Sequence, residues 1–266
     1  MIDVLTQRLS RYPAPEKQAR LREYLQELIL KLIEKSGTAP QLAFIGGTAL
    51  RILYDLQRFS EDLDFSQVKP DFDFLELLQF LKRELTLYGF SITISHKTVG
   101  AVHGSFIKFS DLLYQLELSP FQNQNISIKL EVDTNPPLGY RLESTFIQNS
   151  FLTQVQHFDR PSLFSGKCHA LLCRQYAKGR DYFDLLWFIG NKIQPNYPLL
   201  SAAYEQTHKK RIEFNNESLK TMFADRIQSV DFQKVIDDVA PFLMDRDHLR
   251  YFTTDSFLSV IKNWHD

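Results

Sequence analysis

Residues 44–66, FIGGTALRILYDLQRFSEDLDFS, constrain the fold more than any other part of the sequence. A short apolar segment ends at Gly46-Gly47, and the residues after it have helical spacing, with Thr48 as a possible N-cap. Residues 62–66 then alternate polar and apolar, which is typical of a strand. The order of strand, glycine pair, helix and strand therefore predicts a glycine turn beside the start of a helix.

This order suits the binding of a phosphate and a metal ion. Glycines leave no Cβ in the way of a bulky anion, and a helix start offers unbonded N–H groups and a positive dipole end. On a strand, Asp62 and Asp64 face the same side, while Leu63 and Phe65 point into the core. Two carboxylates beside a phosphate-binding turn suit Mg²⁺ that also binds a nucleoside triphosphate.

A third carboxylate from a neighbouring strand would complete a two-metal site. Glu131 and Asp133 share a face of the predicted strand 126–133 and are both candidates. A lone glycine pair is an ordinary turn, and a lone D-x-D is common on solvated strand ends, so only their combination favours a functional site. The chain contains no G-x-x-x-x-G-K-[ST] phosphate loop and lacks the third glycine of a dinucleotide-binding fingerprint.

The hydrophobic pattern predicts an α+β fold followed by a helical region. We expect a mixed or antiparallel sheet flanked by helices in residues 1–155 and a helical domain in 156–266 that completes the active site. The predicted helices are 15–35, 48–57, 71–88, 162–178, 181–189, 198–210, 216–226, 231–244 and 254–264, and the predicted strands after the D-x-D are 91–96, 105–110 and 126–133.

The charge balance argues against binding of nucleic acid by bulk positive charge. The 266 residues include 31 Lys and Arg and 32 Asp and Glu, a net charge of −1. If 167–178 is one helix, Lys167, Arg174 and Lys178 form a basic stripe on one face, although a solvated helix face is an equal alternative for the last two. Any contact with nucleic acid must therefore come from a local patch.

The chain has the features of a cytoplasmic protein. Cys168 and Cys173 would point to different faces of a helix, so a disulfide between them is not expected. The first residues carry early charges and no apolar run typical of a secretory signal, and no stretch approaches the length of a membrane span.

Residues 44–66 resemble the signature of the AbiEii/MenT-type nucleotidyltransferases, the toxins of type IV toxin–antitoxin and abortive-infection systems. Members of this family, which lies in the DNA polymerase β-like superfamily, carry GGTAL, a helix and then R-x-S-x-D-x-D-F, here at 58–65. A second block resembles the family's later motifs, with K-x-x-A-L at 167–171 and R-D-x-x-D at 180–184. The strand IKLEV at 128–132 resembles its third acidic motif.

The resemblance implies roles for individual residues. Asp62, Asp64 and Glu131 would bind Mg²⁺, with Asp133 in reserve, because the family places this acid directly after lysine and an apolar residue. Gly46, Gly47, Thr48, Lys167 and Arg180 would hold the nucleotide, and Asp181 would act as a base or orient the nucleotide. Arg58 and Ser60 flank the D-x-D and would orient it, and Asp184 would pair with an arginine such as Arg58 or Arg180. A buried ion pair is the alternative reading for both Asp181 and Asp184.

The implied activity is transfer of NMP from an NTP to an acceptor hydroxyl, with Mg²⁺ or Mn²⁺ as cofactor. The implied acceptor is RNA, with the tRNA 3′ end first, which would make the protein a toxin controlled by a separate antitoxin protein. Transfer to a small molecule or a protein, and nucleotide binding without turnover, remain as alternatives. The choice of NTP and the oligomeric state do not follow from the sequence.

Overall fold

The structure is a computed structural model that describes residues 1–264. The chain divides into two compact units, and both are discontinuous in sequence. The sheet unit consists of Met1–Leu53, Phe59–Pro136 and Glu143–His157. The helical unit consists of Tyr54–Arg58, Pro137–Leu142 and the chain from Phe158 onward.

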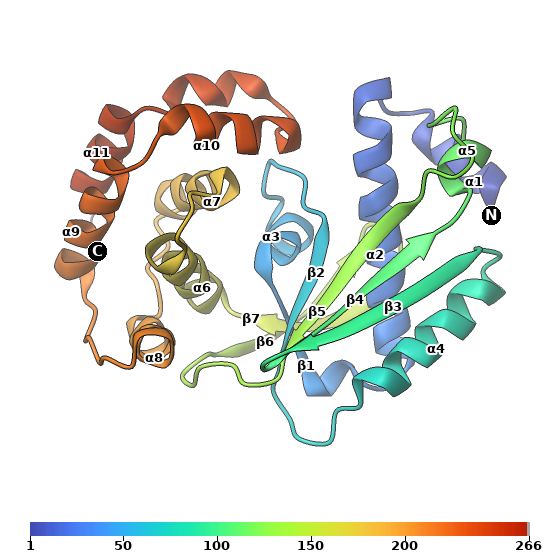
Figure 1. Cartoon of the computed structure of the whole chain (residues 1–266), viewed down its shortest axis with the longest axis horizontal. Helices are drawn as coiled ribbons and strands as arrows, with labels where there is room; N and C mark the ends of the chain where they lie inside the picture. The colour runs from blue at the N-terminus through green and yellow to red at the C-terminus, as the bar shows by residue number, and fades with distance from the viewer. Residues whose placement is uncertain (265–266) are drawn as a thin grey trace. The chain divides into compact units, whose positions relative to one another are not determined.

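A seven-stranded mixed sheet forms the first unit (Figure 1), in the order β3-β4-β5-β2-β1-β7-β6. Its strands are β1 (Leu42–Ile45), β2 (Asp62–Gln67), β3 (Ile92–Val99), β4 (Val102–Phe109), β5 (Ile126–Asp133), β6 (Leu142–Gln148) and β7 (Leu152–Phe158). Strand β2 runs antiparallel to β1 and parallel to β5, so β2 lies inside the sheet with a partner on each side.

The helices of this unit are α1 (Ile2–Leu9), α2 (Lys17–Lys35), α3 (Gly46–Tyr54), α4 (Phe74–Leu87) and α5 (Leu112–Gln115). Two of them, α2 and α4, cover one face of the sheet. α2 packs against β5 and α4 against β3. The apolar residues of β5 are buried on the side facing these helices, and its polar residues alternate with them on the other side. We call the side that points away from α2 and α4 the open face.

The second unit is built mainly of helices. They are α6 (Arg160–Cys173), α7 (Gly179–Gly190), α8 (Tyr197–His208), α9 (Asn216–Gln228), α10 (Phe232–Val239) and α11 (Thr254–Lys262). Side-chain caps define several of their starts; for example, Asp159 accepts a hydrogen bond from the backbone N–H of Ser162. The core of this unit is aromatic, with Phe164 stacked on Phe188 at 4.3 Å between ring centroids.

The predicted fold class, a mixed sheet flanked by helices followed by a helical region, is confirmed. β5 has the predicted bounds. The predicted helix 162–178 is wrong at its C-terminal end, because α6 ends at Cys173 and Arg174 adopts an extended backbone with ψ 136°. Strands β6 and β7 were not predicted.

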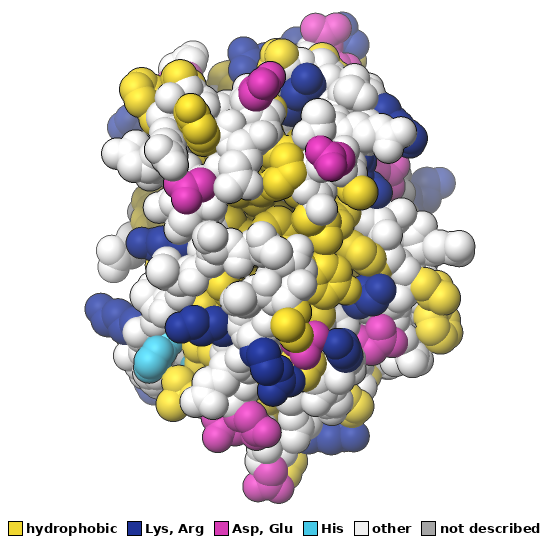
Figure 2. Space-filling view, turned by 90° about the vertical axis from the view of Figure 1, so that its right-hand side faces the viewer, with side chains coloured by type: hydrophobic (Ala, Val, Ile, Leu, Met, Phe, Trp, Pro, Cys, Tyr) yellow, Lys and Arg dark blue, Asp and Glu magenta, His cyan; other side chains and the backbone are white. Residues whose placement is uncertain are grey.

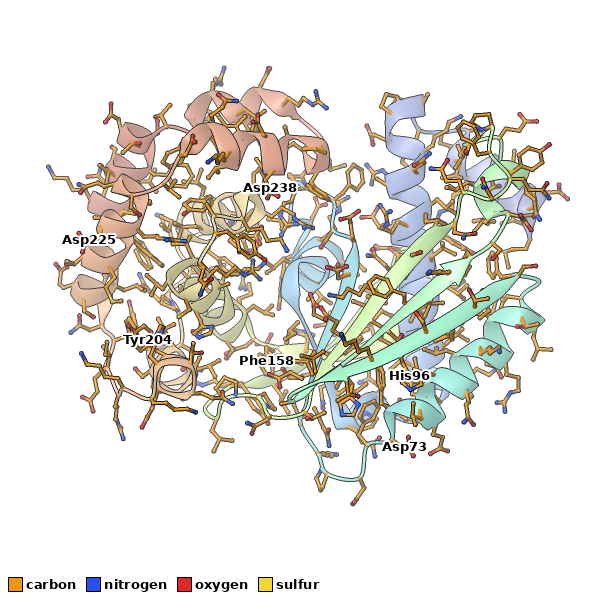
Figure 3. The ribbon with its side chains drawn as sticks, in the orientation of Figure 1. Asp73, His96, Phe158, Tyr204, Asp225 and Asp238 are labelled. Carbon is orange, nitrogen blue, oxygen red and sulfur yellow. The ribbon has the colours of Figure 1, made fainter. Side chains whose placement is uncertain are left out.

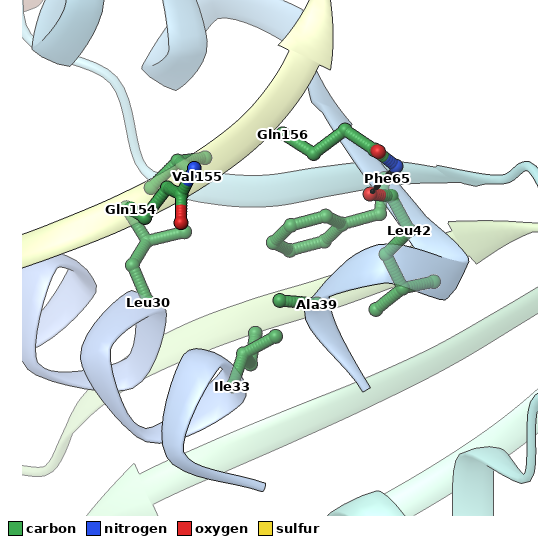
Figure 4. Close-up of a pocket in the computed structure, with 8 residues that line it drawn as sticks. All are labelled: Leu30, Ile33, Ala39, Leu42, Phe65, Gln154, Val155 and Gln156. Atoms are coloured by element: carbon green, nitrogen blue, oxygen red, sulfur yellow. Dashed lines mark hydrogen bonds between the residues drawn. The ribbon is translucent and has the colours of Figure 1, made fainter. Parts of the chain in front are cut away.

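The surface shows no large basic area in the view of Figure 2, where acidic and basic side chains are interspersed. Figure 4 shows a pocket in the sheet unit, lined by apolar residues such as Leu30, Leu42 and Phe65, with room only for a water-sized molecule. It is too small for a nucleotide. Among residues 1–264, no helix is long and apolar enough to cross a membrane.

Candidate functional site

Asp62 and Asp64 lie on the open face of β2. Both are half-buried, whereas Leu63 and Phe65 between and after them are buried in the core. Asp64 is the partner of Ile45 across the antiparallel pair of β2 and β1, so its side chain lies where β1 gives way to α3. The predicted shared face of the two carboxylates is therefore present.

Gly46 leaves room for the carboxylate of Asp64. A Cβ built on Gly46 would lie 2.2 Å from Oδ2 of Asp64, and the φ of Gly46 is +79°, in the left-handed region that favours glycine. Space and backbone conformation thus both select glycine at this position. The carboxylate lies directly against the first residue of α3.

The start of α3 differs from the prediction. The helix begins at Gly46, so Thr48 lies within its first turn and is not the N-cap. The buried Thr48 hydroxyl donates to the backbone carbonyl of Asp62, which fixes the helix start against β2. The first N–H groups of a helix have no partner within the helix, so Gly46, Gly47 and Thr48 would bind a phosphate through the backbone rather than through the threonine hydroxyl.

β5 places a lysine and a glutamate beside these aspartates. Lys129 is the Cα partner of Asp62 and Glu131 that of Asp64, so all four side chains share the open face. Nζ of Lys129 lies 2.7 Å from Oε2 of Glu131. Partial burial on its own would lower the pKa of Lys129, but the carboxylates of Glu131, Asp62 and Asp64 outweigh it, and the pKa is raised.

Lys129 was not predicted as a site residue, although its place two residues before Glu131 on a strand assigns it to the same face. The other candidate carboxylate, Asp133, pairs in register with Ser66, further along β2 than Asp64. Its Oδ1 accepts a hydrogen bond from the backbone N–H of Asn135 at 2.9 Å. The register therefore brings Glu131, and not Asp133, beside Asp64.

The donor set fits a hard divalent cation by its chemistry, since carboxylate oxygens are the ligands that Mg²⁺ prefers. Within residues 1–264, however, no group of three His, Cys, Asp or Glu side chains stands ready to hold a metal ion. Glu131 is instead ion-paired with Lys129. Asp62 and Asp64 are thus the primary candidate ligands.

The second motif block forms a buried ion-pair network within the helical unit. Arg58 donates to both carboxylate oxygens of Asp184, from Nε and Nη2 at 2.7 Å each, and both side chains are almost completely buried. Nζ of Lys167 lies 2.7 Å from Oδ2 of Asp184 and 3.3 Å from Oδ1 of Asp181. The expected pairing of Asp184 with Arg58 is therefore present, and both aspartates are ion-paired.

Other predicted residues lie outside this network or at its edge. The predicted stripe of Lys167, Arg174 and Lys178 on one helix is wrong, because α6 ends before Arg174 and Lys178 directly precedes α7. Arg174 instead pairs with Asp181. The guanidinium of Arg180 lies 4.2 Å from the ring centroid of Phe242. Within the sheet unit, the backbone carbonyl of Ser60 accepts a hydrogen bond from Gln26.

Solved structures resemble most of the chain in fold. JHP933 from Helicobacter pylori is 21% identical with a TM-score of 0.55, and the match covers 93% of this chain and 92% of that chain. A candidate nucleotidyltransferase from H. pylori is 20% identical with a TM-score of 0.58, covering 93% and 95%. A comparison with curated proteins found no match.

The sequence profile of one family matches residues 28–259, which includes both motif blocks. That family is described as the nucleotidyl transferase AbiEii toxin of type IV toxin–antitoxin systems. Because the match covers most of the chain, the protein belongs to the AbiEii family of nucleotidyltransferase toxins.

Proposed function

We propose that this enzyme is Mg²⁺-dependent and transfers NMP from an NTP to the hydroxyl at the 3′ end of tRNA in the cytoplasm. The observation that carries the proposal is the contact of Asp64 with the start of α3, where Gly46 admits its carboxylate. This contact puts two carboxylates beside the N–H groups of a helix start, which supports the binding of a metal-bound triphosphate there.

In the proposed reaction, the acceptor hydroxyl attacks the α-phosphorus of the NTP. A phosphodiester bond forms, the bond between the α- and β-phosphates breaks, pyrophosphate leaves, and the hydroxyl proton passes to water. Asp62 and Asp64 would hold a divalent cation, which would supply positive charge for the developing negative charge on the phosphates. The first backbone N–H groups of α3 would orient the triphosphate.

Glu131 is the third ligand in this proposal. It shares the open face with Asp64 and can join the set when its ion pair with Lys129 opens. Lys129 neutralises part of the acidic cluster in the protein without metal, because its ammonium group lies among the carboxylates. Lys167, Arg180 and Asp181 keep their predicted roles toward the nucleotide as part of the proposal.

The test is transfer of label from each of the four α-³²P-labelled NTPs to total tRNA in the presence of MgCl₂. We expect labelled tRNA with the wild-type protein, loss of label with EDTA, and restoration by Mg²⁺ or Mn²⁺. Asp62→Asn and Asp64→Asn should abolish labelling. Asp71→Asn is the matched control, because Asp71 is exposed and its φ of +65° is well tolerated by asparagine.

The alternatives give different results. Pyrophosphate release with label on a small molecule or on protein, but not on RNA, would identify another acceptor. Nucleotide binding without pyrophosphate release would identify a binding module without turnover. As a member of a type IV toxin family, the chain has an antitoxin as partner, and co-expression with that antitoxin should relieve growth arrest caused by the wild-type protein.

A further inference from the structure

The open face of the sheet continues from the acidic cluster onto β4 and β3. The strand register defines two rows across four strands. The first row is Asp62, Lys129, Phe106 and Ser95, and the second is Asp64, Glu131, Gly104 and Lys97. Neighbouring strands lie about 4.8 Å apart, so Phe106 is roughly 10 Å from Asp62 along the row.

Phe106 is an unusual residue for this position. Its neighbours on β4, Ser105 and Ile107, are buried in the core, whereas the ring of Phe106 lies on the open face with 45% of its surface exposed. Its ring stacks on no other aromatic ring among residues 1–264. A large exposed aromatic surface on a strand marks a candidate contact site for a flat apolar group.

Lysines flank Phe106 on β4 and β3, whereas Glu131 lies diagonally across on β5. Lys108 follows it on the same face of β4, and Lys97 lies diagonally across on β3. Both lysines are exposed, and neither has an ion-pair partner in the described part of the chain. Gly104 lies between Lys97 and Glu131 and has no side chain, so nothing projects from this position beside the ring of Phe106.

We propose that the open face of β3, β4 and β5 binds the single-stranded end of the acceptor RNA, with one base stacked on Phe106 and phosphates beside Lys97 and Lys108. This inference rests on the proposed function, because the acidic row marks where the acceptor hydroxyl must arrive. Aromatic rings interleaved with cationic side chains are the general means by which proteins bind single strands without reading sequence. The short distance to Asp62 lets neighbouring nucleotides of one strand reach both places.

The experiment measures binding of a short fluorescein-labelled single-stranded RNA by anisotropy, with EDTA and without NTP. Under these conditions no transfer can occur, so the experiment measures RNA binding alone. We expect Phe106→Ala to weaken binding by about 5-fold or more, the lower range for loss of one stacked base. Phe106→Trp should bind at least as well as wild type. Phe146→Ala is the matched control, because Phe146 lies on β6 of the same sheet and is 66% exposed.

The lysines have their own readout. Each of Lys97→Gln and Lys108→Gln should reduce the slope of log K against log salt by about 0.7, the value for one phosphate contact with a single strand. Binding of a fluorescent NTP analogue shows whether the base stacked on Phe106 belongs to the acceptor RNA or to the NTP. If it belongs to the acceptor RNA, Phe106→Ala should leave the affinity for the NTP analogue unchanged.

The inference is overturned if the wild-type protein shows no saturable RNA binding. It is also overturned if Phe106→Ala and Phe146→Ala both bind the RNA with the same affinity as the wild-type protein. A loss of NTP-analogue binding in Phe106→Ala, with RNA binding intact, would assign the ring to the nucleotide and also overturn it. An effect of Phe106→Ala on antitoxin binding alone would make the face a protein interface. RNA binding that depends on Phe106, without transfer of label, would refute the proposed transferase activity. It would leave the proposed RNA-binding role of the open face intact.

Discussion

At the residue scale, Gly46 is the position where a single methyl group would have the clearest effect. We expect Gly46→Ala to destabilise the protein by more than the about 1–2 kcal/mol that a left-handed conformation costs an L-residue, because the new Cβ would also meet the carboxylate of Asp64. Urea unfolding measures this change. Binding of divalent cations should weaken as Asp64 is displaced.

Gly37→Ala is the control for this prediction. Gly37 has a φ of +81°, nearly that of Gly46, but no atom lies within 4 Å of the position its Cβ would take. The two variants therefore share the backbone cost and differ in the contact with Asp64. Equal destabilisation by both would show that the contact is unimportant.

At the scale of elements, the start of α7 depends on close packing against α10. A Cβ on Gly179 would lie 2.1 Å from the backbone carbonyl oxygen of Val235, and the N–H of Gly179 donates to Oδ2 of Asp238 at 2.7 Å. Asp238, labelled in Figure 3, thus links the two helices. We expect Gly179→Ala to separate α7 from α10 and to lower the melting temperature of the helical unit.

Gly190 at the other end of α7 provides the comparison. No atom lies within 4 Å of the Cβ position of Gly190. Alanine is the better helix former by about 1 kcal/mol, so Gly190→Ala should be neutral or stabilising in the same melting experiment. A melting temperature of Gly179→Ala equal to that of Gly190→Ala would contradict the packing argument.

The elements also show what the sequence could and could not predict. β5 was predicted with its bounds because its residues alternate strictly between buried and half-buried. β6 was missed because six of its seven residues are exposed, which removes the alternation. The end of α6 was missed because nothing in the local pattern marks Arg174, whose pairing partner, Asp181, lies on the next helix.

For the candidate site, short-range spacing was enough to place Asp62 and Asp64 on one face. The register between β2 and β5 was not predictable from one sequence, because parallel strands are joined by long connections whose length does not fix the pairing. That register decides between Glu131 and Asp133, and it brings Lys129 beside Asp62. The helix start at Gly46 was not predictable either, because threonine is a residue type that is favoured at N-caps and Thr48 therefore indicated a later start.

At the scale of the whole molecule, Asp184 links stability to pH. Burial alone would raise its pKa, but the adjacent Arg58 and Lys167 outweigh burial and lower the pKa. A carboxyl group with a lowered pKa in the folded chain stabilises the fold above its unfolded pKa of about 3.9, and this contribution disappears as the pH falls through the folded pKa. Acid should therefore destabilise the protein partly through Asp184.

We expect Asp184→Asn to cost about 3–5 kcal/mol at neutral pH, because it leaves Arg58 buried without its charged partner. Below about pH 4 the difference from wild type should shrink, as the wild-type carboxyl becomes protonated. Urea unfolding between neutral and acidic pH measures both effects. Asp225→Asn, at an exposed position labelled in Figure 3, should track wild type throughout. A constant difference between Asp184→Asn and wild type would contradict this account.

The central claim is that Asp62 and Asp64 hold a divalent cation beside the start of α3. The most direct measurement is a crystal structure with Mn²⁺ and a non-hydrolysable NTP analogue, in which anomalous scattering locates the metal. We predict a Mn²⁺ peak within about 2.0–2.3 Å of a carboxylate oxygen of each aspartate, close to the spacing of Mg²⁺ and its oxygen ligands. The triphosphate should lie at the N–H groups of Gly46 and Gly47. A metal bound elsewhere, with neither aspartate as ligand, would contradict the account.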